Sequence, residues 1–174
     1  MEILIRQEQK KDWDSVYSVV KAAFEGTEHA DGDEQDLVNR LRKSEAFIPE
    51  LSLVAEWEGK IIGHILFTKL KIGNNEFLAL APVSVLPEYQ GQGVGEKLIK
   101  AGYLLAKKLG FCSVIVVGHP TYYPRFGYTP ASRWNISAPF EVPDNCFMAI
   151  ELTKDGLKGV SGSVEYPQEF FEKT

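Results

Sequence analysis

A glycine-rich stretch between a strand and a helix is the part of this sequence best suited to chemistry. The strand ends near Val85, the loop Gln90-Gly91-Gln92-Gly93-Val94-Gly95 follows, and a helical pattern begins inside it. A turn of this kind points backbone N–H groups and the positive end of the helix dipole at one spot. Glycine lets an anion approach those amides and permits the unusual φ values that the loop requires. The sequence therefore predicts an anion site suited to a phosphate.

Two common phosphate loops do not fit these residues. A Walker loop ends in Gly-Lys-Ser/Thr, whereas this loop ends in Gly-Val-Gly-Glu. The dinucleotide fingerprint G-x-G-x-x-G would need glycine where Glu96 stands, and its ribose-binding acid is missing about 20 residues further on. From the residues alone, a sharp turn without a ligand remains the alternative.

The pattern Gln90-x-x-Gly93-x-Gly95 resembles the Gln/Arg-x-x-Gly-x-Gly/Ala motif of GNAT-family N-acetyltransferases. The flanks agree as well, because a Val-Ser-Val strand end and a Pro-Glu-Tyr turn precede the loop and a long helix follows it. The resemblance implies that loop amides hold the pyrophosphate of acetyl-CoA and that the preceding strand hydrogen-bonds the pantetheine arm through its backbone. The cofactor-binding residues implied in this way are Val83, Val85, Gln90, Gly91, Gln92, Gly93, Val94 and Gly95, with His119 as a further candidate.

A tyrosine-rich segment, residues 119–128, supports the same family. It reads His-Pro-Thr-Tyr-Tyr-Pro-Arg-Phe-Gly-Tyr and resembles the Phe-Tyr-x-Lys-x-Gly-Phe segment of many GNAT enzymes, in which the tyrosine lies near the CoA sulfur. The register implies that Tyr123 is the general acid for the departing thiolate. Packing aromatics are the alternative reading. Pro124 and His119 depart from the family pattern, and His119 either bonds the cofactor or has no role there.

An amine nucleophile must also lose a proton. The strand Glu76–Val85 has no acid in its C-terminal half, and Ser84 is a poor base. His64 on the neighbouring strand has a suitable intrinsic pKa and is the candidate base, unless it is a structural histidine. His29, His64 and His119 fall in separate elements without zinc-site spacing, so we expect no metal.

Acidic residues gather between the first two expected helices. They are Glu25, Glu28, Asp31, Asp33 and Glu34. Such a charge run usually forms a solvated loop. The functional alternative is that the acids attract a cationic amine, because this region commonly borders the acceptor site in GNAT folds.

Hydrophobic periodicity places these residues on secondary structure. Strands are expected at Ile3–Arg6, Leu51–Trp57, Lys60–Leu70, Glu76–Val85, Ser113–Val117 and Phe147–Leu152. The first expected helix follows Asp12 as its cap, and its apolar face carries Trp13, Val16, Val20 and Ala23. A second helix is expected near Glu34–Ser44. A third is expected from Gly93 to Leu109, and Gly110 ends it. Glu58-Gly59 and Gly73-Asn74-Asn75 predict tight turns that make residues 51–85 an antiparallel meander.

This order of elements resembles the GNAT fold, an α/β architecture with a mixed, mostly antiparallel central sheet, flanking helices and splayed central strands. The length of 174 residues and the 44% hydrophobic content fit one domain. We expect a single domain over 1–174. Its core covers about 2–130, and 131–174 form a C-terminal extension that completes the sheet.

Charge and composition restrict the partners. A formal net charge of −5 argues against nucleic acid, and the absence of an apolar run of about 20 residues argues against a membrane. The N-terminus lacks the apolar core of a secretion signal, and Cys112 and Cys146 are expected as reduced thiols, which together predict a cytoplasmic protein.

The expected function is acetyl transfer from acetyl-CoA to the primary amine of a small molecule or peptide by direct attack. Two alternatives remain open. One is a non-catalytic module of the same fold that binds or senses acyl-CoA, and the other is an enzyme using another acyl chain or forming an ester. A homodimer is an arrangement that the sequence neither requires nor excludes.

Overall fold

The computed structural model describes residues 1–27 and 31–172. The strands are β1 (Leu4–Gln7), β2 (Phe47–Trp57), β3 (Lys60–Ile72), β4 (Asn75–Val85), β5 (Ser113–Val117), β6 (Thr129–Pro130), β7 (Ile136–Ser137), β8 (Phe147–Glu151) and β9 (Gly162–Glu165). The helices are α1 (Trp13–Phe24), α2 (Glu34–Arg42) and α3 (Val94–Lys108). Short 3-10 turns include Pro87–Tyr89 before the glycine loop and Tyr123–Phe126 in the tyrosine segment.

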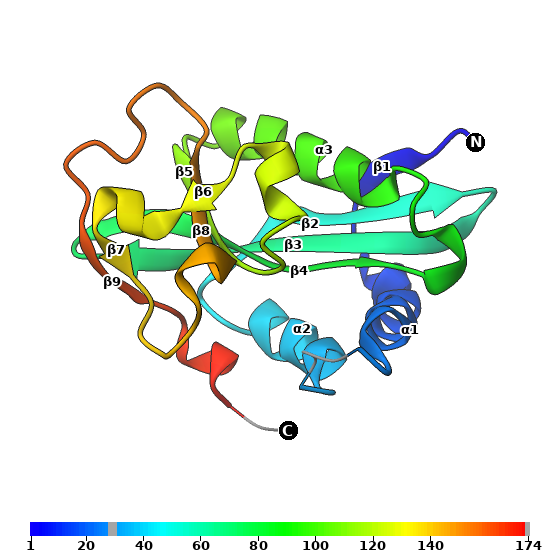
Figure 1. Ribbon diagram of the computed structural model, residues 1–174. Coiled ribbons are helices and arrows are strands. Elements are labelled where there is room, and N and C mark those ends of the chain that lie inside the picture. The colour runs from blue at the N-terminus through cyan, green and yellow to red at the C-terminus, as the bar shows by residue number, and fades with distance from the viewer. Residues whose placement is uncertain (28–30, 173–174) are drawn as a thin grey trace.

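One sheet runs through the molecule in the order β1-β2-β3-β4-β5-β8-β6. Helix α3 covers one face, and α1 and α2 cover the other (Figure 1). Alternation along the strands explains this arrangement, since successive side chains point to opposite faces. On β3, Ile65 and Phe67 belong to the core that contains Leu98 of α3, whereas Leu66 belongs to the core that contains Val16 of α1. The expected α/β fold with a mostly antiparallel sheet is confirmed.

The meander β2-β3-β4 forms through the predicted tight turns. Glu58 and Gly59 join β2 to β3 with φ values of 49° and 78°, the left-handed geometry that two-residue hairpin turns need. Gly73, with φ of 62°, and Asn74 join β3 to β4. These turns fix which side chains lie opposite one another, and they place His64 directly opposite Ser84.

The pairing of β4 with β5 is short, and this opens the sheet. The two strands run parallel with Leu78 opposite Val114 and Leu80 opposite Val116, and β5 ends at Val117. β4 continues to Val85 in register with β3. Within the described residues, the segment 81–85 therefore has no strand partner on its β5 side, which agrees with the expected splay of the central strands.

The C-terminal part adds strands on the far side of β5. β8 pairs with β5 along its whole length, and β9 returns to pair with the end of β3 and with β7. Only β8 was predicted. β6 and β7 have two residues each, too short for periodicity to reveal, and β9 has four.

Some local predictions were wrong. Asp12 precedes α1, but its side chain makes no cap hydrogen bond, because the carboxylate binds Arg6 at 2.8 Å and the amide of Gln9. Trp13 does not lie on the buried face of α1, since it is 40% exposed and the Arg42 guanidinium lies over its ring. β2 begins at Phe47, four residues before the expected start. Over the residues that the structure describes, no helix combines the length and apolar character needed to cross a membrane.

Candidate functional site

The glycine loop has the geometry of an anion site. Gly91 and Gly93 take φ values of 75° and 86°, and Gly93 is the N-cap of α3. The amide of Lys97 donates to the Gly93 carbonyl at 3.1 Å, so the amides of residues 94–96 precede the helical ladder and have no acceptor inside the helix. Gly91, Gln92 and Gly93 are exposed. The loop can therefore present several amides and the positive end of a 15-residue helix to one ligand.

The backbone of Val83 and Val85 faces the opening beside β4. Leu86 donates its amide to Ile62 of β3 at 2.9 Å. Because backbone groups alternate sides along a strand, Val85 and Val83 point theirs away from β3. The Val85 carbonyl accepts the side-chain amide of Gln90 at 3.0 Å. The predicted loop and strand residues are thus brought together at the edge that β5 leaves unpaired.

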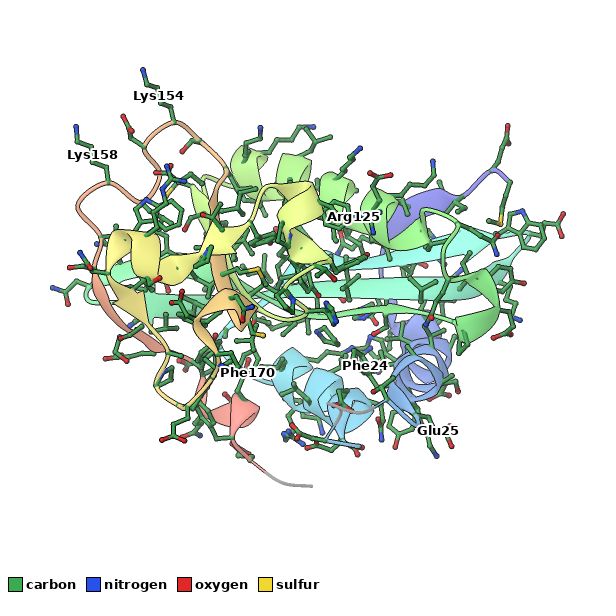
Figure 2. All side chains as sticks on the ribbon, viewed as in Figure 1. Phe24, Glu25, Arg125, Lys154, Lys158 and Phe170 are labelled. Atoms are coloured by element: carbon green, nitrogen blue, oxygen red, sulfur yellow. The ribbon has the colours of Figure 1, made fainter. Side chains whose placement is uncertain are left out.

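Tyr122 closes the side of the loop, a placement that the sequence reading missed. A Cβ atom built on Gly95 would lie 2.5 Å from the Tyr122 hydroxyl, so that hydroxyl rests on the first turn of α3. The Arg125 guanidinium lies over the Tyr122 ring at 5.4 Å, and Figure 2 shows Arg125 on the α3 side of the sheet. The signal in the sequence was Gly95 itself, since a buried helical glycine often marks a close neighbour.

Tyr123 lies under the end of β5. It is 9% exposed, and its ring occupies the space where a side chain on Gly118 would lie. It meets Tyr122 and Tyr128 edge to face, with ring centroids 5.1 and 5.7 Å apart. Burial raises the pKa of Tyr123, and Tyr122 and Tyr103 raise it further. The hydroxyl is therefore protonated at neutral pH, which is the form that a general acid needs.

His119 is exposed, and its Nδ1 atom is engaged by the neighbouring Thr121. The Thr121 amide donates to it at 3.2 Å, and the Thr121 hydroxyl lies 2.9 Å away. Its assignment as a cofactor residue stays a prediction.

His64 lies inside the molecule, on the face of the sheet that carries α1 and α2. Its side chain is 0% exposed, and Nε2 lies 3.0 Å from the Ser52 hydroxyl and 3.7 Å from Glu8. Burial lowers the pKa of His64 to about 4, the Glu8 carboxylate opposes this shift and the Arg42 guanidinium adds to it. The ring is neutral at pH 7 and does not lie at the surface, so it can reach an acceptor only through another group.

Two acids of the run between α1 and α2, Asp33 and Glu34, have local partners. Glu28 and His29 lie outside the described residues. Both carboxylate oxygens of Glu34 accept backbone amides, those of Asp31 and Gly32, and Asp33 lies 3.4 Å from Arg40. Carboxylate oxygens of Asp31, Asp33 and Glu34 lie within 4.8 Å of one another, and the contacts above engage those of Asp33 and Glu34.

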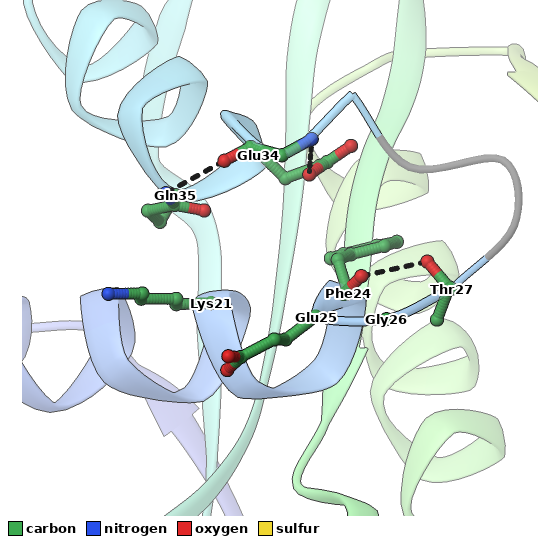
Figure 3. Close-up of a pocket in the computed structure, with 8 residues that line it drawn as sticks. Lys21, Phe24, Glu25, Gly26, Thr27, Glu34 and Gln35 are labelled. Atoms are coloured by element: carbon green, nitrogen blue, oxygen red, sulfur yellow. Dashed lines mark hydrogen bonds between the residues drawn. The ribbon is translucent and has the colours of Figure 1, made fainter.

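A cavity of about 220 Å³ lies between the end of α1 and the start of α2. Figure 3 shows its lining, with Phe24 at the end of α1 and Glu25 just after it opposite Glu34 and Gln35 from α2. Glu25, Glu34 and Lys21 give the described lining of this cavity mixed charge.

Comparison with known proteins identifies the family. Residues 49–130 match the acetyltransferase (GNAT) domain family. The uncharacterized N-acetyltransferase YjhQ of Escherichia coli K12 is 43% identical over 128 residues, which cover 69% of this chain and 71% of YjhQ. The uncharacterized N-acetyltransferase YhbS of the same strain is 30% identical over 171 residues, 97% of this chain and 98% of YhbS.

Solved structures agree. The crystal structure of E. coli YhbS in complex with CoA matches with a TM-score of 0.90 and 28% identity, covering 100% of this chain and 94% of that one. A GNAT acetyltransferase from Brucella melitensis in complex with acetyl-CoA matches with a TM-score of 0.81 and 32% identity, covering 97% and 98%. The chain therefore belongs to the GNAT family of N-acetyltransferases.

Proposed function

We propose that the chain transfers an acetyl group from acetyl-CoA to a primary amine by direct attack. The observation that carries this proposal is the junction of the glycine loop with the unpaired edge of β4. The pyrophosphate would bind the amides of residues 90–95, and the pantetheine arm would bind the backbone of Val83 and Val85 as a partial strand. The CoA and acetyl-CoA complexes of the two similar structures support CoA as the ligand.

Tyr123 would protonate the departing thiolate. A tetrahedral intermediate forms when the amine attacks the thioester carbonyl, and it collapses when the C–S bond breaks. The raised pKa keeps the Tyr123 hydroxyl protonated at neutral pH, so it has a proton to give to the thiolate as the C–S bond breaks. His64 would receive the proton that the amine loses, acting through an intervening group because its ring is buried.

The test is an acceptor screen that follows CoA release. The panel contains spermidine, glucosamine, a free peptide N-terminus and a lysine side chain, with ethanol as an oxygen nucleophile and propionyl-CoA as a second donor. Release with at least one amine, together with the acetylated product by mass spectrometry, is the expected result. Tight acetyl-CoA binding without release for any acceptor would favour the binding module instead.

A further inference from the structure

Five polar side chains from five different segments meet beneath the sheet near the proposed site. They are Glu8 after β1, Arg42 at the end of α2, Ser52 on β2, His64 on β3 and Ser84 on β4. Ser84 lies between Val83 and Val85, whose backbones face the opening. His64 and Ser84 are register partners, so their side chains lie on the same face.

The hydrogen bonds of this cluster fix the tautomer of His64. The Glu8 carboxylate receives the Arg42 guanidinium at 2.5 and 3.1 Å and can only accept hydrogen bonds. Ser52 therefore donates its single proton to Glu8 at 2.9 Å. The Ser52 oxygen is then left as an acceptor for His64 Nε2 at 3.0 Å, so Nε2 carries the proton and Nδ1 presents a bare lone pair.

Two polar atoms at the inner end of this series of hydrogen bonds indicate that a ligand binds there. His64 Nδ1 and Ser84 Oγ are buried, and neither hydrogen-bonds to another part of the chain that the structure describes. Buried polar atoms in folded proteins are rarely left unpaired, and water commonly serves them. Because the two residues face each other across one register position, a single small hydrogen-bonding molecule can serve both.

We propose that one water bridges His64 Nδ1 and Ser84 Oγ and begins a proton path that carries the acceptor's proton to Glu8. This rests on the proposed acetyl transfer. The attacking amine gives its proton to the water, which passes one to Nδ1. The Nε2 proton moves to Ser52, and the Ser52 proton moves to Glu8, which becomes a carboxylic acid beside Arg42. One N–H bond of the amine breaks and one O–H bond of Glu8 forms. The proton later returns through Ser52 and His64 to the water and leaves to solvent, which restores the proton on Nε2.

The path explains how a histidine with a lowered pKa can take part. The ring receives a proton on one nitrogen as it releases one from the other, so it passes between two neutral tautomers. Burial disfavours the imidazolium form, but this transfer never requires that form. The charged groups acting on His64 are Glu8 and Arg42. Ser52 and Glu8 are positioning residues here, because they act through His64 and not on the amine.

The first test needs no acceptor. Protein labelled with ¹⁵N-histidine is measured by NMR, and the His64 signals are assigned by their loss in His64→Gln. We expect a proton on Nε2, none on Nδ1 and a ring that stays neutral down to about pH 5. A proton on Nδ1 would overturn the proposal.

The second test measures kcat/KM against pH, using spermidine or whichever amine of the panel the wild type acetylates fastest. Ser84→Ala and Ser52→Ala should each lower kcat/KM by about 100-fold at pH 7. The kcat/KM of both variants should recover as the pH approaches the pKa of the amine, because no base is needed there. The affinity for acetyl-CoA should not change. The matched control is Thr68→Val, which removes another buried hydroxyl from the same face of β3, one with no hydrogen-bond partner among the described residues.

The two proposals can fail separately. The proton path alone would be overturned if the wild type turns over an amine and kcat/KM depends on pH in Ser84→Ala and Ser52→Ala as it does in the wild type. If no amine supports turnover, acetyl transfer to amines fails, and the path for an acceptor proton fails with it even when the tautomer is as expected.

Discussion

Gly93 and Gly110 stand at opposite ends of α3 and allow strain to be separated from ligand binding. Their φ values are +86° and +92°, and a Cβ atom at either position would meet nothing within 4 Å. Alanine at either position should therefore cost about 1–2 kcal/mol of backbone strain without a clash. In a chain of 174 residues, each kcal/mol lowers Tm by roughly 2–4 °C. Both variants should melt about 2–8 °C below the wild type.

Only Gly93 lies in the loop that would hold the pyrophosphate. A methyl group there interferes with hydrogen bonds from amides to a charged ligand, each worth about 1.5–3 kcal/mol. Losing one such bond corresponds to roughly a 10- to 150-fold rise in the Kd for acetyl-CoA. Isothermal titration calorimetry measures Kd, and thermal melting confirms that Gly93→Ala and Gly110→Ala are equally strained. Equal Kd values for the two variants would refute the assignment of the loop.

Two further predictions concern Tyr123 and His64. Tyr123→Phe should lower kcat by about 100-fold without changing the Kd for acetyl-CoA. The control Tyr128→Phe, in the same aromatic cluster, should leave kcat unchanged. Similar kcat values for the two variants would mean that Tyr123 has only a packing role. The pKa of His64 falls from 6.5 to about 4 on folding, so the unfolded chain takes up the proton first on acidification. The stability from this site is complete above pH 6.5 and declines by up to about 3 kcal/mol between pH 6.5 and 4. Urea unfolding at several pH values should show this slope in the wild type and a shallower one in His64→Gln.

Elements with a continuous or regular apolar pattern could be predicted from the sequence, and elements whose pattern is interrupted or absent could not. Ser113–Val117 was placed at its observed bounds because five consecutive apolar or small residues suit a strand covered on both faces. α1 was found, but the orientation of Trp13 was not, because an indole can pack against the charged groups of Arg42 and Lys10 as readily as it can enter a core. The start of β2 was missed because Pro49 and Glu50 interrupt its apolar pattern.

The shape of the loop could be predicted because its glycines are visible in the sequence, whereas the open edge of β4 was expected only from the family resemblance. The structure brings Val85 and Gln90 into direct contact. The surroundings of His64 left no such sign in the sequence. Its three hydrogen-bonding and charged neighbours, Glu8, Arg42 and Ser52, come from positions 12 to 56 residues away, and only the folded register gathers them.

The glycines of the site serve two physical purposes. One pair shapes the glycine loop, and the other pair makes room for the tyrosine segment. Gly91 and Gly93 are needed for left-handed backbone, and added side chains there would point into open space. Gly95 and Gly118 have no such φ, and what they provide is room, for the hydroxyl of Tyr122 and the ring of Tyr123. The tyrosine segment therefore packs directly against the start of α3 and the end of β5. A change that enlarges Gly95 or Gly118 would move the tyrosines, so loop and tyrosine segment form one unit although 23 residues separate Gly95 from Gly118 along the chain.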